Sequence, residues 1–158
     1  FMSSLGPDDY LALISFQGER ADVLVPLGPA NPVRIFEAMG NITPNGGTPI
    51  GTTLFQAKEL LEQQAQRQAG YGEYTIVLVT DGAASDPDRM AIALETITLE
   101  TPIVIQTVGF CIGNNHALND PSRVVYRAAD DGAALRAGLA AAVAEASDFT
   151  ADGFEQLN

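Results

Sequence analysis

The chain has 158 residues, of which 46% are hydrophobic and 18% are charged, and its net charge is −12. This composition is typical of one globular domain with a hydrophobic core. Eight basic residues against twenty acidic ones argue against a nucleic-acid partner, because phosphates need basic neutralisation. No apolar run approaches the roughly 20 residues of a membrane helix. The single cysteine, Cys111, excludes an internal disulfide.

Apolar runs and turn residues predict alternating strands and helices along the chain. The expected strands are residues 10–16, 21–27, 74–80, 102–110 and 124–126. The expected helices are residues 32–39, a segment from the loop 45–49 to about residue 69, a segment after residues 85–87, and a segment from residue 131 to residue 147. The first strand has the composition of a buried strand, whereas Pro26 places the second at a sheet edge. These elements predict a doubly wound, mostly parallel α/β sheet with helices on both faces and one antiparallel edge strand.

Helical spacing of apolar residues predicts which side of each long helix faces the core. The expected inward residues are Leu54, Ala57, Leu61 and Ala65 in the second helix, Met90, Ala93, Leu94 and Ile97 in the third, and Leu135, Leu139, Val143 and Ala146 in the last. Residues 1–147 therefore form one domain, and residues 148–158 are expected to be a polar tail. The first seven residues resemble the end of a helix followed by a Gly-Pro stop, so we expect a further segment before Phe1.

Two loops are expected at the carboxyl edge of the predicted sheet. One contains Gly46, Gly47 and Thr48, and the other contains Asp81 and Gly82 directly after the strand 74–80. Ligands of open α/β sheets bind at this edge. Glycines allow the backbone to approach a ligand closely, and a hydroxyl and a carboxylate suit a divalent cation such as Mg²⁺. The sequence therefore predicts a cation site that includes Thr48 and Asp81.

These motifs resemble those of the von Willebrand factor A domain, the Rossmann-like fold of integrin inserted domains. In that family a metal-ion-dependent adhesion site holds Mg²⁺ between three loops. The Gly-Gly-Thr of residues 46–48 is similar to the second loop, and the Thr-Asp-Gly of residues 80–82 is similar to the third. The resemblance extends over almost the whole chain, in the order of the strands and helices. It implies a non-catalytic module that binds a protein ligand through an acidic side chain of that ligand.

The first loop of the family, Asp-x-Ser-x-Ser, has no counterpart in the 158 residues. The nearest string, residues 120–124, lacks the final serine and follows no predicted strand. The family's first strand is central in the sheet, so we expect an N-terminal segment or a second chain to supply it. Mg²⁺ prefers about six oxygen ligands, and Thr48 and Asp81 supply two. We therefore expect weak or no binding of Mg²⁺, Mn²⁺ or Ca²⁺ by these residues alone.

Two other functions remain open from the sequence. The first is a degenerate scaffold or assembly subunit of the same family without a metal. The second is an α/β enzyme or receiver domain that accepts a phosphoryl group on Asp81. That chemistry usually needs further acids and a lysine, and Lys58, the only lysine, is expected in the middle of a helix. The alanine-rich, lysine-poor composition is typical of a bacterial protein, and the cellular compartment stays open.

Each candidate residue also has a structural interpretation. Thr48 before Pro49 is suited to cap a helix, and spacing alone favours this role over a metal ligand. Asp81 before Gly82 could simply open a turn. Among the remaining candidates, Asp86 and Asp88 are expected to favour a helix dipole, Asp8 and Asp9 a turn, Asp130 and Asp131 a cap, His116 a surface position and Cys111 a buried one.

Overall fold

The computed structural model describes residues 5, 6, 8–43 and 46–147. The side chains of residue 17 and of residues 145–147 are not described. The expected helix end at residues 1–4 and the expected tail at residues 148–158 lie outside the described residues, as does the orientation of Ala146. None of the helices in the described part of the chain has the length and apolarity needed to cross a membrane.

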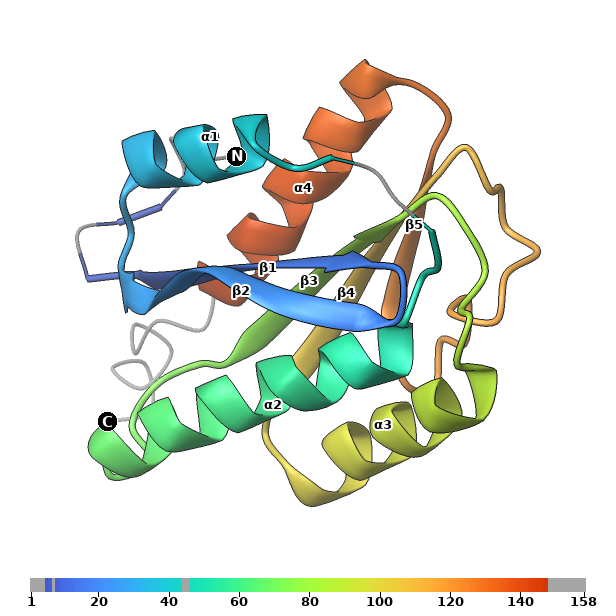
Figure 1. Ribbon diagram of the computed structural model, residues 1–158. Helices are drawn as coiled ribbons and strands as arrows, with labels where there is room; N and C mark the ends of the chain where they lie inside the picture. The colour runs from blue at the N-terminus through green and yellow to red at the C-terminus, as the bar shows by residue number, and fades with distance from the viewer. Residues whose placement is uncertain (1–4, 7, 44–45, 148–158) are drawn as a thin grey trace, which may run out of the picture.

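Strands and helices alternate over most of the described chain (Figure 1). The strands are β1 (Tyr10–Gln17), β2 (Arg20–Pro29), β3 (Thr75–Thr80), β4 (Val104–Phe110) and β5 (Val125–Ala129). The helices are α1 (Pro32–Gly40), α2 (Ile50–Arg67), α3 (Pro87–Glu100) and α4 (Gly132–Ser147). Every expected element is therefore present. The largest difference in bounds is at β5, which continues to residue 129 instead of ending at residue 126.

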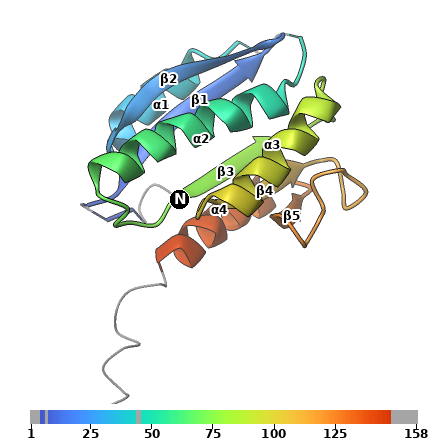
Figure 2. The ribbon, with the colours of Figure 1, turned by 90° about the horizontal axis from the view of Figure 1, so that it is seen from below.

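The strands form two separate sheets. β1 and β2 pair antiparallel, whereas β3, β4 and β5 pair parallel in that order. Across Figure 2 the strands follow the order β2, β1, β3, β4, β5, so that the outer edge of β1 and the outer edge of β3 lie toward each other. No ladder joins these two edges among the described residues. The predicted doubly wound α/β fold is confirmed, with this interruption between β1 and β3.

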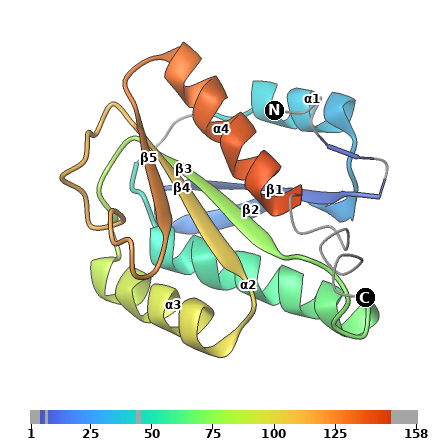
Figure 3. The same ribbon diagram turned by 180° about the vertical axis from the view of Figure 1, so that it is seen from behind.

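Helices cover both faces of the sheets. α2 and α3 lie on one face, and α1 and α4 lie on the other (Figures 1 and 3). α2 contacts both β1 and β3, so it crosses from one sheet to the other. On the opposite face, the amide of Gln106 in β4 donates to the carbonyl of Ala142 in α4 at 3.1 Å and accepts from Arg127 at 2.7 Å. Both the NH2 group and the oxygen of this buried side chain thus have hydrogen-bond partners, and the bond to Ala142 fixes α4 on its sheet.

The predicted inward faces of α2 and α3 are confirmed. Leu54 is buried and the other three residues of the α2 stripe pack against the core, while all four expected residues of α3 are buried. α2 ends before two residues with positive φ, Ala69 at 53° and Gly70 at 82°, a backbone conformation that commonly ends a helix. Asn31 caps α1 by accepting from the amide of Arg34 at 3.1 Å.

The burial prediction for β1 is wrong, and the one for α4 is confirmed only in part. β1 is half-buried along most of its length and Tyr10 is 48% exposed, because one edge of this strand has no neighbour among the described residues. In α4 the most buried positions are Gly138 and Ala142, whereas Leu135, Leu139 and Val143 are only half-buried. Small residues make this contact because a Cβ at Gly138 would already lie 3.3 Å from Val108 of β4. The helix therefore approaches the sheet closely along its small residues.

Candidate functional site

The two loops that the sequence singled out meet at the carboxyl end of β3. The amide of Ser85 donates to the carbonyl of Thr48 at 2.9 Å, which joins the loop before α2 to the loop after β3. Beside this bond, a Cβ added to Gly82 would lie 3.7 Å from the hydroxyl oxygen of Thr48. The hydroxyl of Thr48 therefore lies next to the backbone that follows Asp81.

Gly46 and Gly47 allow the first of these loops to pack against the turn of the β1–β2 hairpin. Gly46 has a φ of 78°, in the region that favours glycine. A Cβ on Gly47 would lie 2.5 Å from the carbonyl oxygen of Gly18, so a side chain cannot be accommodated there without movement. The hairpin turn and the site loop are consequently in direct contact, which links the two-stranded sheet to the site.

Asp86 replaces Thr48 as the cap of α2. The N-cap position is Pro49 and makes no side-chain cap bond. Instead the carboxylate of Asp86 accepts from the amides of Gly51 and Thr52 at 3.0 and 2.8 Å, and from the Thr52 hydroxyl at 3.0 Å. Thus the cap role that spacing alone favoured for Thr48 is not observed, and Asp86, at the N-cap position of α3, makes no side-chain cap bond to α3 and binds the first turn of α2. Sequence spacing could not reveal this bond, since 35 residues separate Asp86 from Gly51.

The hydroxyl of Thr48 and the carboxylate of Asp81 are left without partners. Neither group forms a hydrogen bond or ion pair with any residue in the described part of the chain. Asp81 is exposed, and it lines a hollow of about 180 Å³ between β1 and β3. Phe16 of β1 and Val79 and Thr80 of β3 form part of its wall. The site therefore offers two hard oxygen donors, of which Asp81 lies at the hollow between the sheets and Thr48 lies beside Gly82.

The loop of residues 111–122 lies against the same site, and His116 makes the contact. Its Nε2 lies 3.1 Å from the carbonyl oxygen of Gly82, and its ring stacks on that of Tyr126 with centroids 6.4 Å apart. The expectation of a plain surface histidine is therefore wrong. Nothing in the sequence pairs residue 116 with residue 82, because the contact depends on how the loop folds back over the strand ends. The expectation of a buried Cys111 is also wrong, since it is exposed and has a φ of 57° where the chain leaves β4.

The other acidic residues lie outside this group and have structural roles. Asp131 caps α4, and the amides of Ala134 and Ala133 lower the pKa of its carboxyl group by donating to it. The hydroxyl and amide of Ser122 likewise lower the pKa of Asp120, which closes a turn. Asp9 accepts from the amide of Gly6 at 2.7 Å, as expected of a turn. Asp88 lies in the first turn of α3, where it favours the helix dipole.

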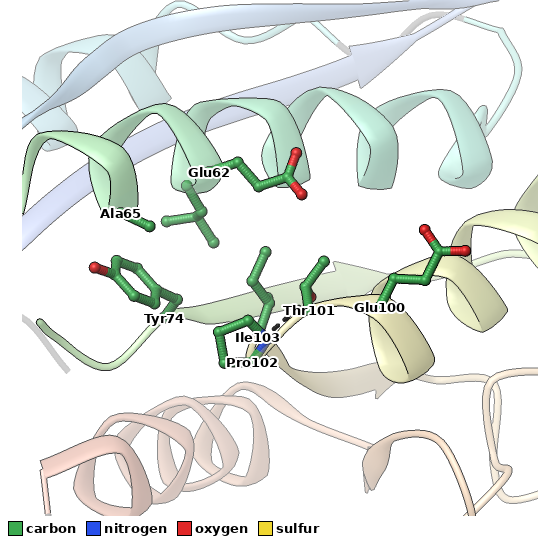
Figure 4. Close-up of a pocket in the computed structure, with 8 residues that line it drawn as sticks. Glu62, Ala65, Tyr74, Glu100, Thr101, Pro102 and Ile103 are labelled. Carbon is green, nitrogen blue, oxygen red and sulfur yellow. Dashed lines mark hydrogen bonds between the residues drawn. The ribbon is translucent and has the colours of Figure 1, made fainter. Parts of the chain in front are cut away.

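A second hollow of about 80 Å³ lies at the opposite end of the three-stranded sheet (Figure 4). Its walls include Leu61 and Ala65 of α2, Tyr74 and Ile103. Two glutamates, Glu62 and Glu100, are the acidic residues of its lining, and Glu62 is already paired with Lys58 at 2.7 Å. This hollow is too small for a typical ligand and contains no group of residues that could perform chemistry.

Known proteins share the fold of this chain. The family model of the von Willebrand factor type A domain matches residues 1–83. A structure of a von Willebrand factor type A protein from Catenulispora acidiphila has a TM-score of 0.71 and 20% identity, and it covers 92% of this chain. A structure of the manganese-loaded TRAP protein of Plasmodium vivax has a TM-score of 0.55 and 20% identity, and it covers 82% of this chain. This chain spans 35% of the first protein and 57% of the second.

The match to the family model extends over more than half of the chain and includes both site loops, Gly46–Thr48 and Thr80–Gly82. The two solved structures agree with it in fold. The chain belongs to the von Willebrand factor type A domain family.

Proposed function

We propose that this chain is a non-catalytic, protein-binding module that uses Mg²⁺ held by Thr48 and Asp81 at the carboxyl edge of the sheet. When bound, the cation supplies a positive charge that attracts an acidic side chain of a partner protein. Gly46, Gly47 and Gly82 shape the backbone around it. One structural neighbour, the TRAP protein of Plasmodium vivax, is manganese-loaded, which supports a divalent cation in this fold.

The observation that carries the proposal is the pair of unpartnered oxygen groups. Two loops 33 residues apart bring a hydroxyl and a carboxylate to one edge of the sheet. In most folds a threonine at this position would cap the following helix. Here Asp86 performs that task, so the oxygen of Thr48 remains available together with Asp81. Both groups are hard oxygen donors of the kind that Mg²⁺ prefers.

The donor set fits part of a magnesium site. Mg²⁺ takes about six oxygen ligands, and water commonly supplies several of them. Among the described residues there is no group of three or more histidines, cysteines, aspartates and glutamates that could hold a metal. Thr48 and Asp81 alone therefore give weak affinity, and further ligands have to come from another segment.

The interruption between β1 and β3 is where such a segment would lie. β1 has one unpaired edge in the described structure, and its apolar side chains are only half-buried. Exposed strand edges of this kind are ready to pair with a further strand. We propose that an N-terminal segment of a longer chain, or a second chain, adds a strand here. The end of that strand would lie at the hollow beside Asp81 and could add ligands to the site.

The position of the only lysine supports a non-catalytic role over phosphoryl transfer to Asp81. Lys58 lies in the middle of α2 and pairs with Glu62 of the same helix at 2.7 Å. A phosphoryl group on Asp81 would need a cation near the carboxyl end of β3. The only lysine is thus paired within its own helix, away from the carboxyl end of β3.

The test is a titration of ¹⁵N-labelled chain with Mn²⁺, followed by NMR, because a paramagnetic ion broadens the signals of nearby amides even at millimolar affinity. We expect broadening to begin at the amides of residues 46–48 and 80–83. Asp81→Ala should abolish this effect, and Asp88→Ala, which removes another exposed acid, should leave it unchanged.

Two outcomes would contradict the proposal. Broadening that is the same in Asp81→Ala as in the unmodified chain would show that Asp81 is not a ligand. Broadening spread over the acidic surface without any preference for residues 80–83 would favour the scaffold function without a metal. Submillimolar affinity of the chain would contradict only the expectation that these residues bind weakly by themselves.

A further inference from the structure

The side chain of His116 joins the loop 111–122 to the site. His116 lies between the carbonyl of Gly82 on one side and the amide of Leu118 on the other, each at 3.1 Å from a ring nitrogen. Leu118 is fully buried, so this end of the loop is anchored in the core. The imidazole therefore connects a fixed point of the core to the backbone that follows Asp81.

The two hydrogen bonds determine the tautomer of the ring. The amide of Leu118 can only donate, so Nδ1 of His116 must be the nitrogen without a proton. In the neutral ring the proton is then on Nε2, which donates to the carbonyl of Gly82. The same carbonyl accepts a bond from the Thr80 hydroxyl at 3.0 Å. Two donors thus fix the orientation of the peptide group between Gly82 and Ala83.

Tyr126 holds the ring of His116 in this orientation. The two rings are stacked with an angle of 11° between their planes. The phenol of Tyr126 donates to the carbonyl of Gly113 in the same loop, and burial raises the pKa of this phenol, which keeps it protonated. Gly109 of β4 leaves the space that the phenol occupies, since a Cβ there would collide with it.

We propose that His116 is a positioning residue of the site: it fixes the backbone after Asp81 and couples it to the loop 111–122. A partner that binds at Asp81 and touches this loop would therefore meet one preorganised surface. This consequence for binding rests on the proposed function, whereas the positioning itself can be measured in the metal-free chain.

Two substitutions of His116 each remove one of the two hydrogen bonds of the ring and retain the other. His116→Gln retains a donor at the position of Nε2 but offers no acceptor for the amide of Leu118. His116→Asn retains an acceptor near the position of Nδ1 but is too short to reach Gly82. The two variants are therefore matched controls for each other.

Amide hydrogen exchange in the metal-free chain is the measurement. We expect the amide of Gly82, which donates to the Thr80 hydroxyl at 3.3 Å, to exchange roughly fivefold faster in His116→Asn and at the original rate in His116→Gln. The amide of Leu118 should show the opposite pattern. Amides of β4 serve as the internal reference, because their exchange reports the stability of the whole sheet.

Unchanged exchange of Gly82 in His116→Asn, or equal acceleration in both variants, would overturn the proposal. The Mn²⁺ titration gives a second readout, in which His116→Asn should weaken broadening around residue 81 and His116→Gln should preserve it. A chain that never binds Mn²⁺ would contradict the proposed function alone, since the exchange experiment still decides the role of His116.

Discussion

β1 and β4 are both rich in apolar residues and have different environments. Both are largely apolar strands, and the sequence predicts β1 as a buried strand. β4 has a hydrogen-bonded neighbour on each side, and residues 105–109 are buried. β1 pairs only with β2 among the described residues, and Ser15 is its one buried position there. The burial of a strand is thus decided by its neighbours as much as by its own side chains, and β1 has the composition of an interior strand while lying at an edge.

A pair of core substitutions tests this comparison with the largest expected effect. Ile105 in β4 is 2% exposed, whereas Ile14 in β1 is half-buried. We expect Ile105→Ala to lower the free energy of unfolding by about 3–4 kcal/mol and Ile14→Ala by roughly 1 kcal/mol, because the cost follows the buried contacts that are lost. Chemical denaturation of both variants measures the difference.

Equal costs would contradict the contrast between the two strands. The same pair of variants also tests the proposal of an additional strand beside β1. In a longer protein or complex in which that strand is present, Ile14 would become more buried, and the cost of Ile14→Ala should rise toward that of Ile105→Ala.

The second prediction concerns the helix that joins the two sheets. Asp86 holds the first turn of α2 by three hydrogen bonds, and α2 contacts both β1 and β3. We expect Asp86→Ala to lower the free energy of unfolding by about 1–2 kcal/mol, as the loss of a helix cap does. Asp88→Ala is the control, and its effect should stay within about 0.5 kcal/mol. Equal effects in urea denaturation would show that Asp86 is not the cap.

The third and smallest effect is a pH dependence of the stability. It arises at the start of α4, the helix that packs on the three-stranded sheet. The amides of Ala134 and Ala133 lower the pKa of Asp131 in the folded chain. A carboxyl group with a lowered folded pKa stabilises the fold above its unfolded pKa, and this contribution is lost as the pH falls through the folded pKa. Asp131→Asn should therefore reduce the melting temperature near neutral pH and make no difference in strong acid. A constant difference at all pH values would contradict this origin.

The local elements could be predicted because their signals are local. Asn31 with Pro32 determines the start of α1, and the apolar spacing of residues 90–97 determines the buried face of α3. The two site loops were also visible in the sequence, since Gly46–Thr48 and Thr80–Gly82 each form a short motif. That they meet in space follows from the parallel strand order, which places strand ends at one edge.

Two of the misassigned residues have partners that lie far away in the chain. Asp86 caps a helix 35 residues earlier, and His116 bonds to a carbonyl 34 residues away. Cys111 is exposed because the backbone turns with positive φ as it leaves β4. In α4 the large apolar residues lie beside the line of closest contact with the sheet, because Gly138 and Ala142 make that contact.

The sequence by itself determined the alternation of strands and helices and the two motifs of the site, because periodicity and turn chemistry act within a few residues. Only the tertiary structure decided which helix Asp86 caps and where His116 bonds, and also which oxygens stay without partners and which edge of β1 stays open among the described residues. These properties depend on contacts between segments distant in sequence, and the order of residues does not encode the distances between such segments directly.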